Sequence, residues 1–160
     1  MSIDPPHGQA HAVIGKILFE KEFYRSAEFY ILKASSLDPE NFENLYLAGR
    51  SQLMVKNYER AEIFFKQAEK LNPDFPQVYF YTGMARANRG DVNGAAASFN
   101  KDLMKEPDNI VARDNRGFAM MKIENMPWAL EEFEFVLSKK PKPYRGLSKE
   151  RHLHCQDGKS

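Results

Sequence analysis

The chain has 160 residues, a length that fits one domain. Its 23 Lys and Arg almost balance its 22 Asp and Glu, and the net charge of +1 argues against broad nucleic-acid binding, which needs a clear excess of cations. The single cysteine excludes an intrachain disulfide. No stretch approaches about 18 uncharged apolar residues and no secretory signal is recognisable, so no membrane span is expected and a cytoplasmic location is predicted.

Residues 1–7 are predicted to be a flexible N-terminus, and a 34-residue period follows them. The period divides the chain into four units, predicted at residues 8–41, 42–75, 76–109 and 110–141. Four columns of residues recur in phase, and their agreement is very improbable by chance. They are Pro39, Pro73, Pro107 and Pro141; Gly15, Gly49, Gly83 and Gly117; Ala27, Ala61, Ala95 and Ala129; and Ile31, Phe65, Phe99 and Phe133.

Each unit contains two amphipathic stretches of helical length that are separated by a turn. In the second unit these stretches are residues 42–56 and 58–71, with a turn near Asn57. The third unit turns at Gly90-Asp91, where glycine suits a left-handed conformation and Asp suits a helix cap. The fourth unit turns at Asn125, and Pro127 falls in the first turn of the next helix.

The recurring columns have simple physical roles within one repeat. Gly49 on the first helix is expected to face the Ala61 region on the second, because small residues let two helix backbones approach closely. The ring of Phe65 is expected to fill the remaining gap, and its burial contributes about 1.5–3 kcal/mol. The proline that ends each unit stops the second helix, since it donates no amide hydrogen bond.

This pattern resembles the tetratricopeptide repeat over roughly residues 8–141. The second unit carries the family's order of residues in Leu45, Ala48, Gly49, Tyr58, Ala61, Phe65, Ala68 and Pro73. The resemblance implies an all-α fold, a right-handed α-solenoid of antiparallel helix hairpins (a TPR-like superhelix). Arg116 departs from the family, in which Leu is commoner, and its guanidinium is expected to reach Glu132 while its stem covers the core.

The resemblance further implies that the first helices line a concave groove and the second helices form the convex back. The residues predicted to bind a partner there are Lys16, Phe19, Tyr46, Arg50, Met54, Phe80, Met84, Asn88, Asp114, Phe118 and Lys122. Leu53, Ala87 and Met121 share the same face but are expected to belong to the helix–helix core. The rings and methionines favour a protein or peptide partner with an apolar or amphipathic segment, either helical or extended.

The predicted function is a protein–protein interaction scaffold or adaptor, with two alternatives. The first is a small chaperone of a secreted or assembling protein, although the strict fourfold period counts against it. The second is a self-associating module that forms homo-oligomers through the C-terminal end. The acidic chaperone tails that some family members bind are an improbable ligand, because only Lys16 and Arg50 suit a carboxylate at the relevant phases.

Residues 142–160 are predicted to be a basic tail or a weak capping helix, since residues 138–160 carry seven Lys or Arg and two acids. Contact of this tail with nucleic acid or another anion is a third, weaker hypothesis. His152, His154 and Cys155 lack a fourth ligand at usable spacing, so no metal site is predicted. No nucleophile with an oriented base and no phosphate-binding loop is recognisable, so no enzyme activity, catalytic residue or cofactor is predicted.

Overall fold

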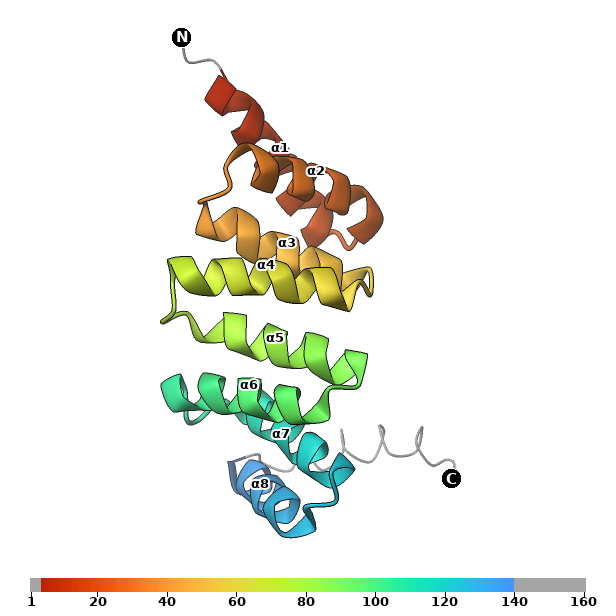
Figure 1. Cartoon of the computed structure of the whole chain (residues 1–160), viewed down its shortest axis with the longest axis vertical. Coiled ribbons are helices and arrows are strands. Elements are labelled where there is room, and N and C mark those ends of the chain that lie inside the picture. Colours follow the sequence, from red (N-terminus) through yellow and green to blue (C-terminus); the bar gives the residue numbers. More distant parts are fainter. Residues whose placement is uncertain (1–3, 140–160) are drawn as a thin grey trace. The chain divides into compact units, whose positions relative to one another are not determined.

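The computed structural model describes residues 4–139, and the regular structure in this range is entirely α-helical. Figure 1 shows the helices in chain order, each connected to the next by a short turn. The helices are α1 (Asp4–Glu20), α2 (Tyr24–Leu37), α3 (Phe42–Met54), α4 (Tyr58–Leu71), α5 (Pro76–Arg89), α6 (Val92–Lys105), α7 (Ile110–Lys122) and α8 (Met126–Lys139).

The helices pack in consecutive hairpins, α1 with α2, α3 with α4, α5 with α6 and α7 with α8. The chain divides into two compact units, Met1–Pro107 and Asp108–Ser160, whereas the chain length suggested one domain. We call them unit 1 and unit 2. A stack of hairpins has contacts only between neighbours and no single shared core, so it divides at a repeat boundary.

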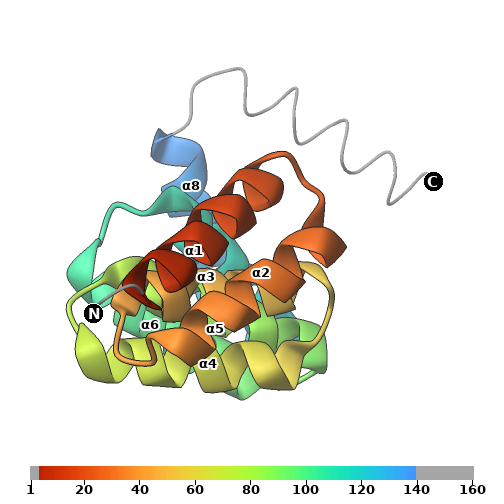
Figure 2. The same cartoon turned by 90° about the horizontal axis from the view of Figure 1, so that it is seen from above.

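Unit 1 is an α-solenoid of three hairpins. The second helix of each hairpin packs against the first helix of the next, α2 on α3 and α4 on α5. Among the first helices, α3 also contacts both α1 and α5, so these three helices form one face of unit 1, which we call the first-helix face. In the view along the stack, α2 and α4 lie on the same side of α1 (Figure 2).

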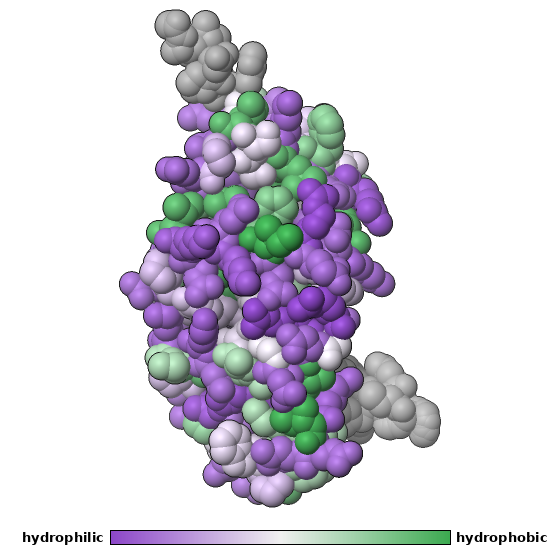
Figure 3. Space-filling view, viewed as in Figure 1, coloured by the Kyte–Doolittle hydropathy of each residue, from purple (hydrophilic) through white to green (hydrophobic). Residues whose placement is uncertain are grey.

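The opposite face of unit 1 consists of the second helices and is largely hydrophilic, with isolated hydrophobic residues (Figure 3). Ile63 on α4 and Met104 on α6 are such residues, with 54% and 82% of their surface exposed. Scattered apolar side chains of this kind are normal on a solvated surface. This back face therefore offers control positions for tests of the first-helix face.

The glycine column faces the second helix of its hairpin, but the neighbouring side chain differs from the prediction. A β-carbon placed on Gly49 would meet the ring of Phe65 and not the Ala61 region. Phe65 and Ala61 are both fully buried. The ring therefore fills the space that the missing side chain leaves, and the glycine and aromatic columns depend on each other.

The turn inside each hairpin contains a residue with a positive φ angle, at the same position of every 34-residue repeat. Glu22, Lys56, Gly90 and Glu124 all have positive φ angles, of 66°, 68°, 96° and 63°. A left-handed residue commonly ends an α-helix, which explains why α3 ends at Met54, two residues before the predicted end. At Gly90 the prediction is confirmed, and the adjacent Asp91 caps α6 by accepting a hydrogen bond from the Gly94 amide at 2.9 Å.

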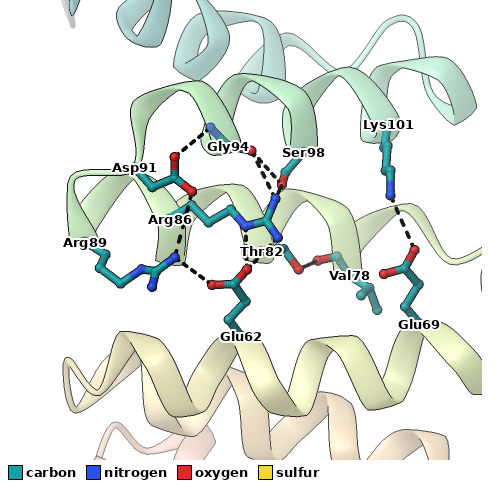
Figure 4. Close-up of polar contacts among 10 residues, drawn as sticks. All are labelled: Glu62, Glu69, Val78, Thr82, Arg86, Arg89, Asp91, Gly94, Ser98 and Lys101. Atoms are coloured by element: carbon teal, nitrogen blue, oxygen red, sulfur yellow. Dashed lines mark hydrogen bonds and ion pairs between the residues drawn. The ribbon is translucent and has the colours of Figure 1, made fainter.

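An ion-pair cluster connects the second and third hairpins (Figure 4). Glu62 on α4 accepts hydrogen bonds from Nε of Arg86 at 2.6 Å and from Arg89 at 3.1 Å, both on α5. The Arg86 guanidinium also donates to the hydroxyl of Ser98 on α6 at 3.2 Å. The Glu62 side chain is only 14% exposed, so this cluster links three helices in a partly desolvated setting.

Unit 2 contains the fourth hairpin, and the described part consists of α7 and α8. Arg116 forms an ion pair with Glu132, as the sequence predicted, and Arg113 donates to the same carboxylate at 3.1 Å. Glu132 is 7% exposed, so two guanidinium groups compensate one buried charge.

Two of the predicted segments lie at the ends of the chain, at residues 1–7 and 142–160. Helix α1 begins at Asp4, inside the segment 1–7 that was predicted to be flexible, because Pro5 and Pro6 suit the first turn of a helix, where no amide donor is needed. The tail or capping helix predicted at residues 142–160, and the residues His152, His154 and Cys155, lie outside the described residues.

Candidate functional site

A cavity of about 560 Å³ opens on the first-helix face between α1 and α3. Its wall combines apolar, aromatic and charged side chains. They are Ala12, Val13, Lys16, Phe19, Glu20, Glu22, Tyr24, Glu43, Asn44, Tyr46, Leu47 and Arg50. Four of the predicted binding residues, Lys16, Phe19, Tyr46 and Arg50, therefore surround one cavity.

The centre of this site is Arg50, whose guanidinium contacts three aromatic rings. The guanidinium carbon lies 5.0 Å from the ring centroid of Phe19, 5.7 Å from that of Tyr46 and 4.9 Å from that of Tyr81. These rings come from α1, α3 and α5, so one side chain joins all three first helices. Cation–π contacts of this kind contribute about 0.5–2 kcal/mol each and restrict the guanidinium.

Tyr46 belongs to a network of rings that continues from the cavity toward α5. Its ring centroid lies 5.8 Å from that of Phe42, 5.2 Å from that of Phe75 and 6.0 Å from that of Tyr81. Burial raises the pKa of the Tyr46 hydroxyl to about 12, although the Arg50 charge acts in the opposite direction. The phenol is thus neutral at physiological pH and presents an apolar ring with one polar atom.

The cavity wall contains two cations and three acids. In the described part of the chain, neither Lys16 nor Arg50 forms an ion pair with an Asp or Glu side chain. Arg86, by comparison, is held by a carboxylate. Arg50 instead shares a side-chain hydrogen bond with Tyr46.

The remaining predicted residues of unit 1 extend the first-helix face on α3 and α5. Met54 is 44% exposed, and Phe80 and Met84 are partly buried. The ring of Phe80 lies 5.9 Å from that of Phe99, so it supports the core as well as the surface. Asn88 is exposed, and its amide donates to the carbonyl of Met84 at 2.8 Å.

In unit 2 the predicted residues lie on α7. Phe118 is 38% exposed and its ring packs 5.1 Å from that of Phe133. Asp114 is partly buried and Lys122 is exposed. Because they belong to the other compact unit, these residues form a separate set from the cavity in unit 1.

Leu53, Ala87 and Met121 were expected to belong to the helix–helix core, and this is confirmed only for Leu53. Leu53 is partly buried and packs against the core cluster around Phe65. Ala87 is exposed and Met121 is 40% exposed, so both lie on the surface.

Sequence reasoning missed several residues of this site. Tyr81 completes the ring cage around Arg50, and Tyr24, Glu43 and Asn44 line the cavity. Tyr81 stands directly after the predicted Phe80, at the phase of Val13 and Leu47, which also line the cavity. Two adjacent positions of the repeat, those of Phe80 and Tyr81, thus contribute to the site. The prediction used only the position of Phe80.

Residues 4–139 contain no helix that is long and apolar enough to cross a membrane. The same residues contain no group of three His, Cys, Asp or Glu side chains that is placed to hold a metal ion. The arrangement consists of rings and charges on a helical surface, which suits binding of another molecule.

Comparison with known proteins agrees with this geometry. The tetratricopeptide repeat model matches residues 42–75, which are the second hairpin. The chain is 29% identical over 148 residues to the tetratricopeptide repeat domain-containing protein PYG7, chloroplastic, of Arabidopsis thaliana. That similarity covers 87% of this chain and 49% of the relative, so the chain spans about half of the relative's length.

Solved structures of MamA have the same fold. One MamA crystal structure superposes with a TM-score of 0.81 at 22% identity, over 89% of this chain and 83% of the other. MamA from Desulfovibrio magneticus RS-1 gives a TM-score of 0.79 at 21% identity, over 82% of this chain and 74% of the other. The matched family model identifies residues 42–75 as a tetratricopeptide repeat, and the repeat-containing relative and the shared helical fold support the same assignment for the other hairpins.

Proposed function

We propose that the protein is an interaction scaffold that binds an apolar or amphipathic segment of a partner protein on its first-helix face. The observation that carries this proposal is the cavity between α1 and α3, where Arg50 is surrounded by three rings. Aromatic and Arg side chains are common anchors of protein interfaces. Tetratricopeptide-repeat proteins in general mediate protein–protein interaction, which supports the proposal.

The surface next to the cavity supports a segment and not a small molecule as the ligand. Rings continue from Tyr46 to Phe75 and Tyr81, and the flexible side chains of Met54 and Met84 lie on the same face. Methionine adapts to apolar partners of varied shape. An extended or helical segment several residues long would cover this surface, whereas a compact ligand would fill only the cavity.

The proposal includes no catalysis, in keeping with the interaction role that is general in this family. A chaperone role would use the same face, and nothing in the geometry favours it over a scaffold. We also propose a cytoplasmic location, although the Arabidopsis relative is named as chloroplastic. Subcellular fractionation that recovers the protein only in an organelle would refute this location.

Self-association is a second candidate function, because the outer helices at both ends of the repeats carry exposed aliphatic residues. Ile14 and Ile17 on α1 are 41% and 48% exposed, and Leu130 and Leu137 on α8 are 54% and 56% exposed. In a repeat protein such surfaces are normally covered by a neighbouring hairpin or a polar cap. Light scattering at high concentration would decide this point, since a strict monomer rules out homo-oligomers.

The scaffold proposal can be tested by quantitative co-purification from the native host. We choose Met54→Glu with Met84→Glu on the first-helix face, because these changes add charge without removing the ring network. The expected result is loss of the recovered partner, since the introduced carboxylates stay hydrated and oppose apolar contact. The matched control is Ile63→Glu with Met104→Glu on the back face.

The control variant should recover the partner at the wild-type level. Equal recovery by all three proteins would show that the first-helix face is not the binding surface. Loss in the control variant alone would place the interface on the second helices. Helical circular dichroism of each variant establishes that it is folded before recovery is compared.

A further inference from the structure

We propose that copies of the chain associate head to tail, with an exposed apolar stripe on α8 of one copy packed on an exposed apolar stripe on α1 of the next. The α8 stripe consists of Leu130 and Leu137, and the α1 stripe consists of Ile14 and Ile17. This inference rests on self-association, the second candidate function, and specifies its interface.

The α1 stripe occupies repeat positions that are buried in the next first helix. Ile14 stands 34 residues before Ala48, and Ile17 stands 34 residues before Ser51. Ala48 and Ser51 on α3 are fully buried, and α3 is covered by α2. In α1 the same positions hold larger aliphatic side chains that are 41% and 48% exposed. The α1 stripe therefore corresponds to the surface on which a preceding second helix packs inside unit 1.

The α8 stripe occupies repeat positions that face the next hairpin. Leu130 is at the repeat position of Glu28 on α2 and Glu62 on α4. Each of these two carboxylates accepts a hydrogen bond from a side chain of the next first helix, at 3.2 Å and 2.6 Å. Leu130 is 54% exposed, and Leu137, about two helical turns further along the same side of α8, is 56% exposed. The α8 stripe is thus the counterpart of the surface that receives a first helix inside unit 1.

The two stripes match each other in chemistry. Gln52 and Arg86 donate the hydrogen bonds to the two carboxylates, and α1 has Leu18 at their repeat position. The junctions inside unit 1 therefore pair an acid with a polar or cationic side chain, whereas both sides of the proposed junction are apolar. Because the change occurs on both sides, Leu130 of one copy can pack on Leu18 of another without leaving a polar group unpaired.

The proposed interface is heterologous, because it joins two different surfaces of the same chain. A heterologous contact is repeated from copy to copy and gives rings or filaments, whereas an isologous contact between two identical surfaces stops at a dimer. Association is therefore expected to continue beyond two copies.

Sedimentation of the full chain at rising concentration, up to the millimolar range, tests this inference. One chain has a mass of 18.5 kDa, and the weight-average mass of the wild type should rise above twice this value. Leu130→Lys with Leu137→Lys, and Ile14→Lys with Ile17→Lys, should each weaken association by at least about tenfold, because a hydrated ammonium opposes apolar contact. Unchanged association of either variant would overturn the inference.

Lysine is chosen for these variants because of one cation next to the α1 stripe. Lys21 stands at the repeat position of Arg89, which forms an ion pair with Glu62. A glutamate at position 130 could therefore form a new ion pair with Lys21 of the next copy, whereas a lysine is repelled.

Mixing the two lysine variants in equal amounts determines the orientation of the contact. One variant keeps an intact α8 stripe and the other keeps an intact α1 stripe, so a head-to-tail interface allows one contact between them. The mixture should reach the mass of a dimer and grow no further. A mixture that stays monomeric, while the wild type associates, would overturn the inference.

The matched control is Ile63→Lys with Met104→Lys, which places the same charges at exposed positions of the back face. This variant should associate like the wild type, and helical circular dichroism establishes that each variant is folded. A wild type that stays monomeric over the whole concentration range would overturn the inference. The α8 stripe would then have to be assigned to residues 140–160 of the same chain or to a different protein.

The same measurements separate this inference from the proposed functions. If the wild type associates and both stripe variants associate equally well, self-association stands and the interface is wrong. Recovery of a partner protein on the first-helix face should be unaffected in the stripe variants, so the scaffold proposal is tested independently.

Discussion

The ring of Phe99 lies against the backbone of Gly83, so close that a β-carbon built on the glycine would stand 2.6 Å from Cε1 of the ring. Phe99 is 1% exposed, so the ring lies in the protein interior. The same relationship joins Gly49 to Phe65 and Gly117 to Phe133. Three of the four hairpins therefore depend on a contact between a glycine and a ring, and in the first hairpin Ile31 takes the place of the ring against Gly15.

Gly83→Ala is expected to lower the free energy of unfolding by up to about 2 kcal/mol, because the methyl group overpacks the ring of Phe99 at a cost of about 1–3 kcal/mol. The higher helix propensity of Ala, worth about 1 kcal/mol, offsets only part of this cost. Urea unfolding followed by circular dichroism measures the difference.

The control for this prediction is Gly8→Ala on α1. There a β-carbon would meet Leu37 at an ordinary 3.6 Å, so stability should stay constant or rise by up to about 1 kcal/mol. A Gly83→Ala variant as stable as Gly8→Ala would show that the ring adjusts at no cost.

Glu62→Gln is expected to destabilise the protein by about 1–3 kcal/mol, since it leaves Arg86 and Arg89 without the carboxylate that they share. The matched control is Glu69→Gln, which removes one ion pair of 3.6 Å to Lys101 from a side chain that is 35% exposed. Exposed pairs contribute about 0–1 kcal/mol, so the control should change stability by less than about 0.5 kcal/mol. Thermal unfolding of both variants compares the two pairs, and equal melting temperatures would contradict the prediction.

Asp91→Ala is expected to cost about 0.5–2 kcal/mol, because it removes the side-chain cap of α6. Asn57 occupies the equivalent position before α4 but its side chain makes no capping hydrogen bond. Asn57→Ala should therefore have a smaller effect on the urea midpoint. If both variants lose the same stability, the hydrogen bond from the Gly94 amide is not the cause.

The raised pKa of Tyr46 predicts a loss of stability at high pH. Burial raises its pKa from 10.0 to about 12, so the folded chain holds the phenol proton in a range where the unfolded chain has released it. The free energy of unfolding should therefore be unaffected by this group below about pH 10 and fall between pH 10 and 12. Tyr46→Phe removes the group, so the wild-type curve should fall more steeply than the curve of the variant. Parallel curves across this range would disprove the assignment.

Much of the fold could be predicted from the sequence, because each 34-residue repeat contains the residues that form its own helix hairpin. The 34-residue period, the glycine and aromatic columns and the turn at Gly90 gave the hairpins and most helix boundaries. The end of α3 was missed because Lys56 adopts a left-handed backbone that its side chain does not favour. The start of α1 was missed because two prolines, usually read as breakers, occupy the first helical turn.

The candidate site was only partly predictable. Repeat phase placed Lys16, Phe19, Tyr46 and Arg50 on one face, since residues at equivalent positions of stacked helices lie near one another. The position of a residue within the repeat could not show that Arg50 would contact three rings, or that the ring of Tyr81 would be one of them. Those contacts depend on side-chain directions across three helices, which a single period does not encode.

The sequence by itself determined that this protein is a series of nested helix hairpins, because close helix packing needs small residues opposite rings at a fixed spacing. Only the tertiary structure decided where a cavity opens and which charges are paired with an internal carboxylate. Whether a side chain is compensated depends on residues from other hairpins. Arg86 is bound by Glu62, whereas Arg50 faces an open cavity, and only the packed helices distinguish these two arginines.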